Sequence, residues 1–509
     1  MLAKVLSGAL IGIDAYPVEV EVDIVQGLPQ FATVGLPDGA VKESKDRVKA
    51  AIKNSGYEFP VRRITINLAP ADIRKDGAAF DLPMAIGILA ATGVVPSDRA
   101  AKFAFLGELS LDGCIKPVRG ALPVAVAAHQ WGLDGLILPL ENAREGAIVE
   151  GLTIYGISDL GQLVDFLNGR QAVEPCRVDA AELFAQGSIH DVDFAEVRGQ
   201  EHVKRSLEVA ASGGHNLLMV GPPGSGKTML ARRLPTILPD MGFAEALDTT
   251  KIHSIVGLLP RQDALISTRP FRSPHHTISD AGLIGGGTMP KPGEVSLAHH
   301  GVLFLDELLE FKKNVLEMLR QPLEDGQVTI SRAATTLTYP ADFMLVAAMN
   351  PCPCGYLGDP LHSCTCTPLM VQRYRRRLSG PLLDRIDLHV EVPRISHKEL
   401  SEDEEGESSA AIRARVERAR EIQRERFAGS TTLCNAAMKP RQLRKFCALD
   451  EAGQQLMEMV TDRLGFSART YTRLLKVART IADLAESEQI QQSHLAEAIQ
   501  YRSLDRRTQ

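Results

Sequence analysis

The eight residues from Gly221 to Thr228 constrain the fold of this chain more than any other stretch. They read Gly221-Pro222-Pro223-Gly224-Ser225-Gly226-Lys227-Thr228. The apolar run Leu217–Val220 precedes them and a helical pattern follows, so the sequence predicts a strand, a phosphate-binding loop and a helix. Glycines in such a loop let backbone N–H groups close around phosphate oxygens at the helix N-terminus. We therefore expect Lys227 to reach the β- and γ-phosphates of ATP and the Thr228 hydroxyl to bind Mg²⁺, whereas a chance glycine loop would lack this context.

Polar residues follow two further apolar runs in the same part of the chain. The run from Val302 to Leu305 leads directly into Asp306 and Glu307. The run from Phe343 to Ala348 is followed closely by Asn350. Because open α/β sheets bind ligands at the carboxyl ends of their strands, we expect these side chains to meet at one site. Asp306 would hold Mg²⁺, Glu307 would polarise the attacking water, and Asn350 would orient that water or sense the γ-phosphate.

The 509 residues fall into three regions of distinct periodicity, in line with about one domain per 150 residues. Residues 1–167 alternate strand-like and helix-like runs, and the periodicity fades across residues 168–197, which indicates a linker. Residues 198–400 alternate again, residues 401–409 are acidic without apolar side chains, and residues 410–509 show only helical spacing. The predicted fold class is therefore α/β, with two α/β domains followed by an all-helical lid.

No segment has the composition of a membrane span or of a secretory signal. The longest apolar stretch, from Leu82 to Pro96, has 15 residues and is too short to cross a bilayer. A short apolar run near the N-terminus is preceded by the single cation Lys4 and then gives way to strand-like alternation. We therefore expect a cytoplasmic protein whose eight cysteines are reduced.

The phosphate loop, the Asp306-Glu307 pair and Asn350 together resemble the AAA+ superfamily. Nearly the whole chain is similar to its magnesium-chelatase-like branch, especially the bacterial YifB/ComM family. The resemblance implies an AAA+ core at residues 198–400 and a homo-hexameric ring that hydrolyses ATP with Mg²⁺. It also implies an arginine that acts on the neighbouring subunit's site. This arginine is called the arginine finger. The segment Leu382-Leu383-Asp384-Arg385-Ile386-Asp387 looks like the one that carries it, which nominates Arg385 as the finger.

The same resemblance implies a second arginine in the helical lid. Ser467-Ala468-Arg469 opens a predicted helix and is similar to the family's second sensor, which nominates Arg469. Arg473 lies one helical turn later and is the alternative. A surface salt bridge is the ordinary role of a lone arginine, and it remains the competing interpretation for Arg385 and Arg469.

Four of the eight cysteines crowd together as the pairs Cys352-Pro353-Cys354 and Cys364-Thr365-Cys366. Four thiolates suit a tetrahedral Zn²⁺ site that would close this loop. The spacing departs from the commoner zinc knuckle, so four unligated thiols and a site with His362 in place of one thiolate stay open as alternatives. In YifB-type proteins, paired cysteines recur directly after the asparagine that corresponds to Asn350. The resemblance therefore favours a structural zinc.

Residues 1–167 resemble the Lon protease domain over short segments between Lys75 and His129. Lon-type peptidases use a serine nucleophile that a lysine base activates. By this resemblance the serine position falls on Ala79 and the lysine position on Leu122, and neither side chain can perform that chemistry. We therefore expect a Lon-like fold kept for binding or ring assembly, although Ser110 and Lys116 leave a shifted site open.

Two insertions in the second domain carry basic residues. One lies between the phosphate-loop helix and Asp306, and the other is a predicted hairpin that begins near Gly326. Both resemble insertions that ring helicases of the related clade direct into the central pore, which implies contacts with DNA. The side chains suited to backbone phosphate are Arg272, His275, His276, Lys291 and Arg332. The competing interpretation is that they brace the insertion or a subunit interface.

The net charge of −6 conceals a basic C-terminal region. Residues 410–509 hold 18 Lys and Arg against 12 Asp and Glu. This excess suits either a polyanionic partner or an ordinary solvated helical face.

The YifB/ComM resemblance implies a ring ATPase that moves branched or single-stranded DNA, with branch migration during natural transformation as its task. A magnesium-chelatase motor subunit is the first alternative, and the Lon-like region and the cysteine pairs disfavour it. A protein remodeller or regulated peptidase is the second, and it would call for a Ser/Lys dyad that the first domain lacks at the matching positions.

Overall fold

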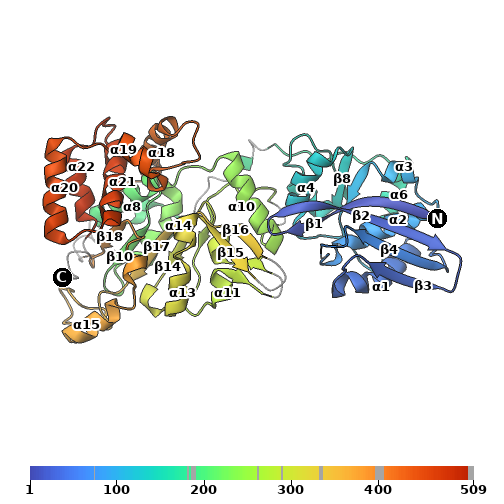
Figure 1. Ribbon diagram of the computed structural model, residues 1–509, viewed down its shortest axis with the longest axis horizontal. Coiled ribbons are helices and arrows are strands. Elements are labelled where there is room, and N and C mark those ends of the chain that lie inside the picture. Colours follow the sequence, from blue (N-terminus) through green and yellow to red (C-terminus); the bar gives the residue numbers. More distant parts are fainter. Residues whose placement is uncertain are drawn as a thin grey trace. The chain divides into compact units, whose positions relative to one another are not determined.

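The computed structural model describes residues 1–73, 75–179, 183–184, 191–260, 263–287, 290–331, 336–395 and 406–502. The chain divides into two compact units (Figure 1). Unit 1 consists of Met1–Ser188 and Phe243–Ser267, and unit 2 consists of Ile189–Gly242 and Thr268–Gln509.

A seven-stranded mixed sheet forms the framework of unit 1 (Figure 1). Its strands are β1 (Leu2–Ile11), β2 (Asp14–Val25), β3 (Gln30–Val34), β4 (Arg63–Ala69), β5 (Phe103–Phe105), β8 (Gly135–Pro139) and β9 (Ile154–Ile157). They lie in the order β3-β4-β2-β1-β5-β8-β9, with β1 antiparallel to β2 and β2 antiparallel to β4. On β2, Val18, Val20 and Val22 are buried while the acidic residues between them are not, because successive side chains point to opposite faces. The alternation seen in the sequence is therefore that of a strand.

Helices and short strands complete unit 1. They are α1 (Gly39–Asn54), η1 (Ala78–Phe80), α2 (Asp81–Ala91), α3 (Ser97–Ala100), β6 (Glu108–Leu109), β7 (Ile115–Lys116), α4 (Ala121–Ala128), η2 (His129–Trp131), η3 (Leu140–Asn142), α5 (Ala143–Gly146) and α6 (Leu160–Leu167). Every residue of α2 is buried, so most of the longest apolar stretch forms a core helix. Among the helices of the described residues, none combines the length and the apolar character that a membrane crossing requires.

One helix of unit 1 comes from the middle of the chain. Helix α10 (Phe243–Val256) follows the phosphate-loop region in sequence but packs against α4. The backbone N–H of Gly120 donates to the Ser254 carbonyl at 3.2 Å, and a Cβ added to Gly257 would lie 2.8 Å from Arg119 Nε. The segment 243–267 thus folds with the N-terminal α/β region, although periodicity alone groups it with residues 198–400.

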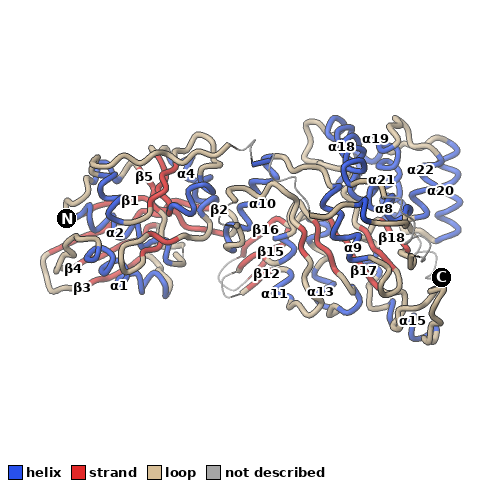
Figure 2. Tube along the Cα trace, turned by 180° about the vertical axis from the view of Figure 1, so that it is seen from behind, coloured by secondary structure: helices blue, strands red, loops and turns tan. Residues whose placement is uncertain are grey.

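A five-stranded parallel sheet forms the core of unit 2 (Figure 2). Its strands are β10 (Leu217–Val220), β11 (Phe271–Arg272), β14 (Val302–Leu305), β17 (Met344–Met349) and β18 (Leu388–Glu391). They lie in the order β11-β14-β17-β10-β18. Every residue of β10, β14 and β17 is buried, as expected for parallel strands covered on both faces. The three apolar runs of the sequence are therefore the three central strands, which confirms the α/β prediction for this region.

Helices and two hairpins surround this sheet. They are η4 (Phe194–Glu196), α8 (Glu201–Gly213), α9 (Lys227–Arg233), η5 (Leu234–Ile237), α11 (Asp280–Leu283), α12 (Glu294–Leu297), η6 (Leu308–Glu310), α13 (Lys313–Met318), α14 (Pro322–Asp325), α15 (Pro368–Arg375) and α16 (Gly380–Leu383), with hairpins β12 (Gly285–Gly286)/β13 (Lys291–Pro292) and β15 (Gln327–Ser331)/β16 (Thr336–Pro340). The two hairpins touch, because the Tyr339 hydroxyl donates to the Pro290 carbonyl at 2.7 Å. Gly285 also lies near Ile330, and it must be a glycine because its φ is +110° and an added Cβ would lie 2.4 Å from the Lys291 carbonyl oxygen.

The C-terminal region is helical, as the sequence predicts (Figure 1). It contains α18 (Ser409–Arg426), η7 (Asn435–Ala437), α19 (Pro440–Phe446), α20 (Glu451–Leu464), α21 (Ala468–Leu484) and α22 (Gln492–Gln500). Ser408 and Ser467 cap α18 and α21 by accepting a backbone N–H three residues later. Residues of α18 and α21 share one apolar core with the strands and α8, so the lid belongs to unit 2.

Candidate functional site

The phosphate loop lies between β10 and α9, where the sequence places it. Lys227 begins α9, and its ammonium donates to the carbonyls of Gly221 at 2.8 Å and Pro222 at 2.9 Å. Gly224 and Gly226 adopt φ of +75° and +87°, which glycine reaches without strain. Burial lowers the pKa of Lys227, and the carboxylates of nearby Asp306 and Glu307 oppose that shift. The loop is therefore closed on its lysine, which is placed to exchange carbonyl oxygens for phosphate oxygens.

The carboxyl ends of three adjacent strands bring the expected polar groups together. The Thr228 hydroxyl donates to Asp306 Oδ2 at 2.6 Å, and Asn350 Oδ1 lies 3.5 Å from Lys227 Nζ. Asp306 follows β14 and Asn350 follows β17, which pairs with both β14 and β10. A hydroxyl and a carboxylate oxygen at this separation fit a single Mg²⁺, which prefers oxygen ligands. Mg²⁺ held by Thr228 and Asp306 would neutralise charge on the ATP phosphates.

Glu307 sits in a conformation that few non-glycine residues adopt. Its φ is +50°, and its backbone N–H donates to Asp306 Oδ1 at 2.9 Å. The Glu307 side chain is exposed, and its Oε2 lies 3.4 Å from His276 Nδ1. His276, which the sequence suggests as a DNA contact, therefore lies beside the proposed catalytic carboxylate. Sequence spacing gives no sign of this pairing, because the two residues belong to separate segments.

Gln200 is a further contributor that the sequence analysis does not identify. Its φ is +58°, and its side-chain N–H group donates to the carbonyls of Ser225 and Pro393, each at 2.9 Å. This buried amide ties the phosphate loop to the residues that follow β18. Gly221 also meets that segment, because an added Cβ would lie 2.1 Å from the Val392 carbonyl. Close packing against Val392 therefore requires a glycine at position 221.

Arg385 lies near the amino-terminal ends of the parallel strands, and the phosphate loop lies at their carboxyl ends. Asn216 immediately precedes β10, and its side chain donates to the Arg385 carbonyl at 3.0 Å and accepts from the Leu345 N–H at 2.8 Å. The phosphate loop follows the four residues of β10, which span roughly 13 Å at about 3.3 Å per residue. The Arg385 backbone thus lies about the length of β10 away from the phosphate loop of its own chain.

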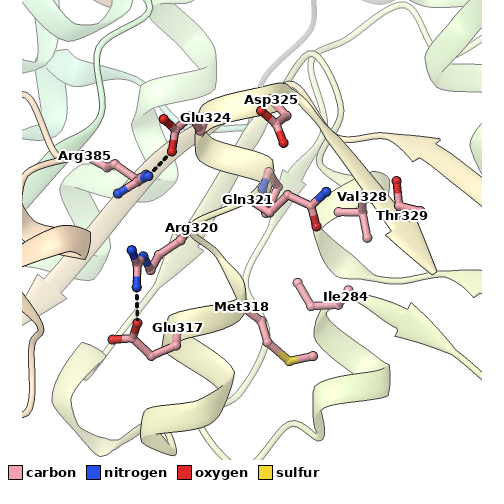
Figure 3. A pocket seen from close by; sticks show the side chains of 11 residues that line it. Ile284, Glu317, Met318, Arg320, Gln321, Glu324, Asp325, Val328, Thr329 and Arg385 are labelled. Atoms are coloured by element: carbon pink, nitrogen blue, oxygen red, sulfur yellow. Dashed lines mark hydrogen bonds and ion pairs between the residues drawn. The ribbon is translucent and has the colours of Figure 1, made fainter. Parts of the chain in front are cut away.

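The Arg385 guanidinium is held in a pocket (Figure 3). It donates to the Pro381 carbonyl at 2.7 Å and forms an ion pair with Glu324, while the side chain is only 9% exposed. Hydrogen bonding to Arg385 lowers the pKa of Glu324, with a smaller contribution from the charge of Arg469. Arg469 is exposed at the start of α21, so both arginines share the surroundings of Glu324.

Arg473, the alternative to Arg469, has a different environment. Its guanidinium donates to the Arg385 carbonyl at 2.9 Å and pairs with the buried Asp387. Burial by itself would raise the pKa of Asp387, but Arg473 and His215 hold it below its ordinary value. Arg473 thus compensates a buried charge that would otherwise be costly. These contacts favour a structural role for Arg473.

The four clustered cysteines converge on one point. The Sγ atoms of Cys352, Cys354, Cys364 and Cys366 all lie within 4.8 Å of one another. Cys352 Sγ is 3.3 Å from Cys354 Sγ and 3.7 Å from Cys364 Sγ, close to the ~3.8 Å that a tetrahedral Zn²⁺ with Zn–S of about 2.3 Å requires. Backbone N–H groups near the loop lower the pKa of Cys354 to about 5, which favours its thiolate. The cluster is consistent with zinc.

The alternative in which His362 replaces one thiolate is wrong, because His362 is not among the described residues that converge on the site. His362 stacks on Tyr356 with ring centroids 4.8 Å apart, and its Nδ1 lies 3.7 Å from Asp359. The metal-ligand group that the described residues form consists of cysteines alone.

The cysteine loop adjoins the phosphate loop. Gly355 adopts φ of +86°, and a Cβ added there would lie 2.7 Å from Pro223 Cδ. Arg375 on α15 donates to the Pro351 carbonyl at 3.4 Å. Burial raises the pKa of Tyr374, and the charges of Cys352 and Glu307 add to that shift, which places Tyr374 near both. The loop therefore flanks the nucleotide site.

The residues proposed to contact DNA lie in several environments. Arg272 forms a two-point ion pair with Glu294 at 2.6 and 2.8 Å, which favours bracing of the insertion. His275 hydrogen-bonds to Thr277 at 2.9 Å, and its ring lies tilted against that of His276 with the centroids 4.1 Å apart. Lys291 is exposed on the β13 hairpin strand. Arg332 lies outside the described residues.

The positions of the Lon-type dyad are apolar and packed. Leu122 is fully buried, and Ala79 packs against the same core cluster that contains Ala121 and Val124. The Ser110 hydroxyl bonds Asp112 and the Cys114 carbonyl. Lys116 lies opposite Glu108 in the strand register of the short β6/β7 ladder, and it is exposed. The hydroxyl of Ser110 is thus engaged by acceptors other than a lysine.

Three family models match consecutive stretches of the chain. The model described as Subunit ChlI of Mg-chelatase matches residues 20–142. The model described as Magnesium chelatase, subunit ChlI, matches residues 193–400, which contain the phosphate loop, Glu307 and Arg385. The model described as Magnesium chelatase, subunit ChlI C-terminal, matches residues 406–502.

Full-length relatives agree with these models. Competence protein ComM of Haemophilus influenzae is 45% identical over 515 residues, which cover 99% of this chain and 98% of the relative. Uncharacterized protein YifB of Escherichia coli is 46% identical over 508 residues, with coverage of 99% and 98%. Lon protease 2 of Bacillus subtilis is 32% identical over 127 residues, which cover 24% of this chain and 22% of the relative. The chain belongs to the ComM/YifB family of magnesium-chelatase-like AAA+ ATPases.

Proposed function

We propose that this protein is a ring-forming ATPase that uses ATP hydrolysis to move DNA, and that its substrates are branched or single-stranded. The observation that supports a ring is that Arg385 lies at the amino-terminal end of β10, whereas the phosphate loop of the same chain lies at its carboxyl end. An arginine there can complete a nucleotide site only on another chain. A head-to-tail arrangement of copies repeats this contact and closes as a ring, which we propose to be a hexamer.

In this ring one subunit binds the nucleotide and the next supplies positive charge. The phosphate loop with Lys227, the Mg²⁺ ligands Thr228 and Asp306, and the base Glu307 form the first half. Arg385 and Arg469, which share the surroundings of Glu324, form the second half. Positive charge aimed at the γ-phosphate stabilises the transition state of phosphoryl transfer. Hydrolysis therefore depends on assembly.

The DNA part of the proposal rests on the hairpins and on a relative's name. The hairpins β12/β13 and β15/β16 pack together through Tyr339 and Pro290, and Lys291 is exposed on them. A relative of similar length is called a competence protein, which points to incoming DNA. Since a ring holds DNA through its backbone, we expect binding to ignore sequence and to weaken by roughly 0.7–0.9 log unit per log unit of salt for each phosphate contact. Arg332 stays a predicted contact.

The decisive assay follows strand release from a three- or four-stranded junction with a homologous arm, with and without ATP. Release that requires ATP and fails for Glu307→Gln supports a DNA motor. The Glu307→Gln chain should still bind ATP, whereas Lys227→Ala should not, and this pair separates loss of chemistry from loss of binding. Junction binding with no movement under any nucleotide would reduce the protein to a DNA-associated ATPase.

A magnesium-chelatase motor is the second candidate, because all three matching family models describe that enzyme's ChlI subunit. Such a motor would hydrolyse ATP to drive Mg²⁺ into a tetrapyrrole through a partner chain. The measurement that separates the two is which addition stimulates ATP turnover. Forked DNA should do so for a DNA motor, and a tetrapyrrole-binding partner for a chelatase.

A further inference from the structure

The segment that flanks the nucleotide site carries an exposed apolar and basic surface. Leu361 is 71% exposed and Leu369 is 54% exposed, and Met370 and Leu357 are also exposed. Arg373 lies on α15 together with Leu369 and Met370, and Arg376 directly follows that helix; both arginines are exposed, and no ion pair recorded among the described residues includes either one. We call this surface the cysteine-loop tip, defined by Leu357, Leu361, Leu369, Met370, Arg373 and Arg376. Exposed leucines clustered with arginines are typical of a protein interface.

A pocket of about 510 Å³ surrounds Arg385 (Figure 3). Its apolar wall includes Met318, which is 43% exposed, and Ile284. Its acidic side chains are Glu317, Glu324 and Asp325, of which Glu317 pairs with Arg320 and Glu324 pairs with Arg385. Asp325 is exposed, and the ion pairs recorded for the described part of the chain do not include it. We call this concave site the finger pocket.

The tip and the finger pocket belong to opposite sides of one catalytic contact. The segment that carries the tip borders the phosphate loop, because a Cβ added to Gly355 would lie 2.7 Å from Pro223 Cδ and the charge of Glu307 contributes to raising the pKa of Tyr374. The pocket borders Arg385. Resting on the proposed ring, in which Arg385 reaches the phosphate loop of the next chain, the surfaces around these two groups must face each other.

We propose that the finger pocket receives the cysteine-loop tip of a second copy of this chain. The apolar side chains of the tip match Met318 and Ile284, and its arginines match the acidic side of the pocket. Electrostatic complementarity of this kind fixes orientation and rejects wrong partners. Because donor and acceptor are different surfaces of the same chain, the contact repeats head to tail.

The same contact accounts for how Arg385 becomes available. Glu324 holds Arg385 in the pocket of the single chain. An arginine of the incoming tip offers Glu324, which is 57% exposed, another counter-charge, so that Arg385 can exchange this ion pair for the phosphate of that neighbour. Seating of the tip and release of the finger are then one event.

Assembly of the full-length chain tests the proposal. The Glu307→Gln background with ATP prevents turnover, and sedimentation velocity over a series of protein concentrations reports ring formation. We expect the pair Arg373→Glu and Arg376→Glu to raise the concentration for half-assembly by roughly tenfold or more, because like charges would meet in the pocket. Adding Asp325→Arg should restore assembly in part. The control Arg424→Glu, at an exposed arginine on α18, should leave assembly unchanged.

A second measurement does not depend on charge reversal. A chain with Met318→Cys and Leu369→Cys, treated with a bis-maleimide in the presence of ATP, should give a stronger ladder of cross-linked subunits than either single variant or the unmodified chain, which report cross-linking through the native cysteines. Absence of this ladder in rings that do form would overturn the proposal. So would unchanged assembly of the arginine variants, or intact assembly with lost DNA binding, which would make the tip a DNA surface. If the unmodified chain forms no ring with ATP, the proposed function itself fails.

Discussion

Ser254 offers the sharpest test of how helix α10 is attached to unit 1. Its hydroxyl donates to the carboxylate of Glu145 on α5, which also accepts the Leu122 N–H and the Asn142 side-chain N–H, each at 3.0 Å. Glu145 is buried, and burial raises its pKa while these hydrogen bonds oppose that shift. Replacing Ser254 with alanine removes one of three donors from a buried acid and the side-chain link between α5 and α10.

The size of the effect follows from the acceptor. A hydrogen bond to an ionised group contributes about 1.5–3 kcal/mol, roughly twice the value for a neutral pair. If α10 opens locally, this loss makes its amide hydrogens exchange about 10- to 150-fold faster. Hydrogen exchange of the full-length chain, read on peptides that cover residues 243–256, measures this directly.

Ser7→Ala is the matched control. The Ser7 hydroxyl is also buried in unit 1, but it donates to the neutral Phe105 carbonyl at 2.9 Å and lies on β1 rather than at α10. Its loss should cost about 0.5–1.5 kcal/mol and leave α10 exchange unchanged.

The pH dependence of the Ser254→Ala destabilisation independently checks whether Ser254 stabilises the ionised form of Glu145. The Ser254 hydrogen bond stabilises the ionised form of Glu145, since it lowers a pKa that burial raises. The destabilisation caused by Ser254→Ala should therefore be smallest at a pH below the raised pKa, where Glu145 is protonated, and should grow as the pH rises through that value. Unchanged exchange of α10 in Ser254→Ala, or an equal change in Ser7→Ala, would refute the attachment of α10 through this pair.

Three further predictions concern the nucleotide site. Metal-free purification should leave about one Zn²⁺ per chain by elemental analysis, and Cys354→Ser should lose it; folded, fully active protein without metal would rule out a structural zinc. Gly355→Ala should weaken ATP binding because its Cβ would meet Pro223, whereas Gly358→Ala, at a similar φ but in open space, should bind ATP normally in the same titration. Doping Arg385→Ala chains into unmodified rings should lower ATP turnover more steeply than the mutant fraction, and a strictly proportional fall would indicate independent sites.

The nucleotide half of the site could be predicted because its information is local. Each group follows an apolar run of four to six residues, and such runs become buried parallel strands whose carboxyl ends share an edge. Lys227, Asp306 and Asn350 therefore meet without any knowledge of the connections between the strands. The helical lid was predictable for the same reason, since its periodicity and its serine caps are visible in the sequence.

Contacts between distant segments could not be predicted. The approach of His276 to Glu307 depends on how the insertion folds back over β14, and no residue pattern encodes that path. The two hydrogen bonds of Gln200 depend on where the chain enters α8. The placement of α10 in unit 1 depends on buried contacts with α4, whereas its own sequence shows only an unremarkable helical segment.

The structure also suggests why the two halves of the site are held so differently. The nucleotide half rests on buried strands and on a lysine held by two backbone carbonyls, so the exchange that ATP binding requires is confined to the loop. The arginine half is held by an ion pair whose partner, Glu324, is 57% exposed and accessible to competition. An exposed ion pair contributes little to stability and exchanges readily, whereas an arginine left without a partner in a pocket would be costly. In the proposed ring, Arg385 would thus stay ordered in the single chain yet transfer to a neighbour's phosphate at small cost, and we expect the barrier to hydrolysis to fall only when a neighbour is present.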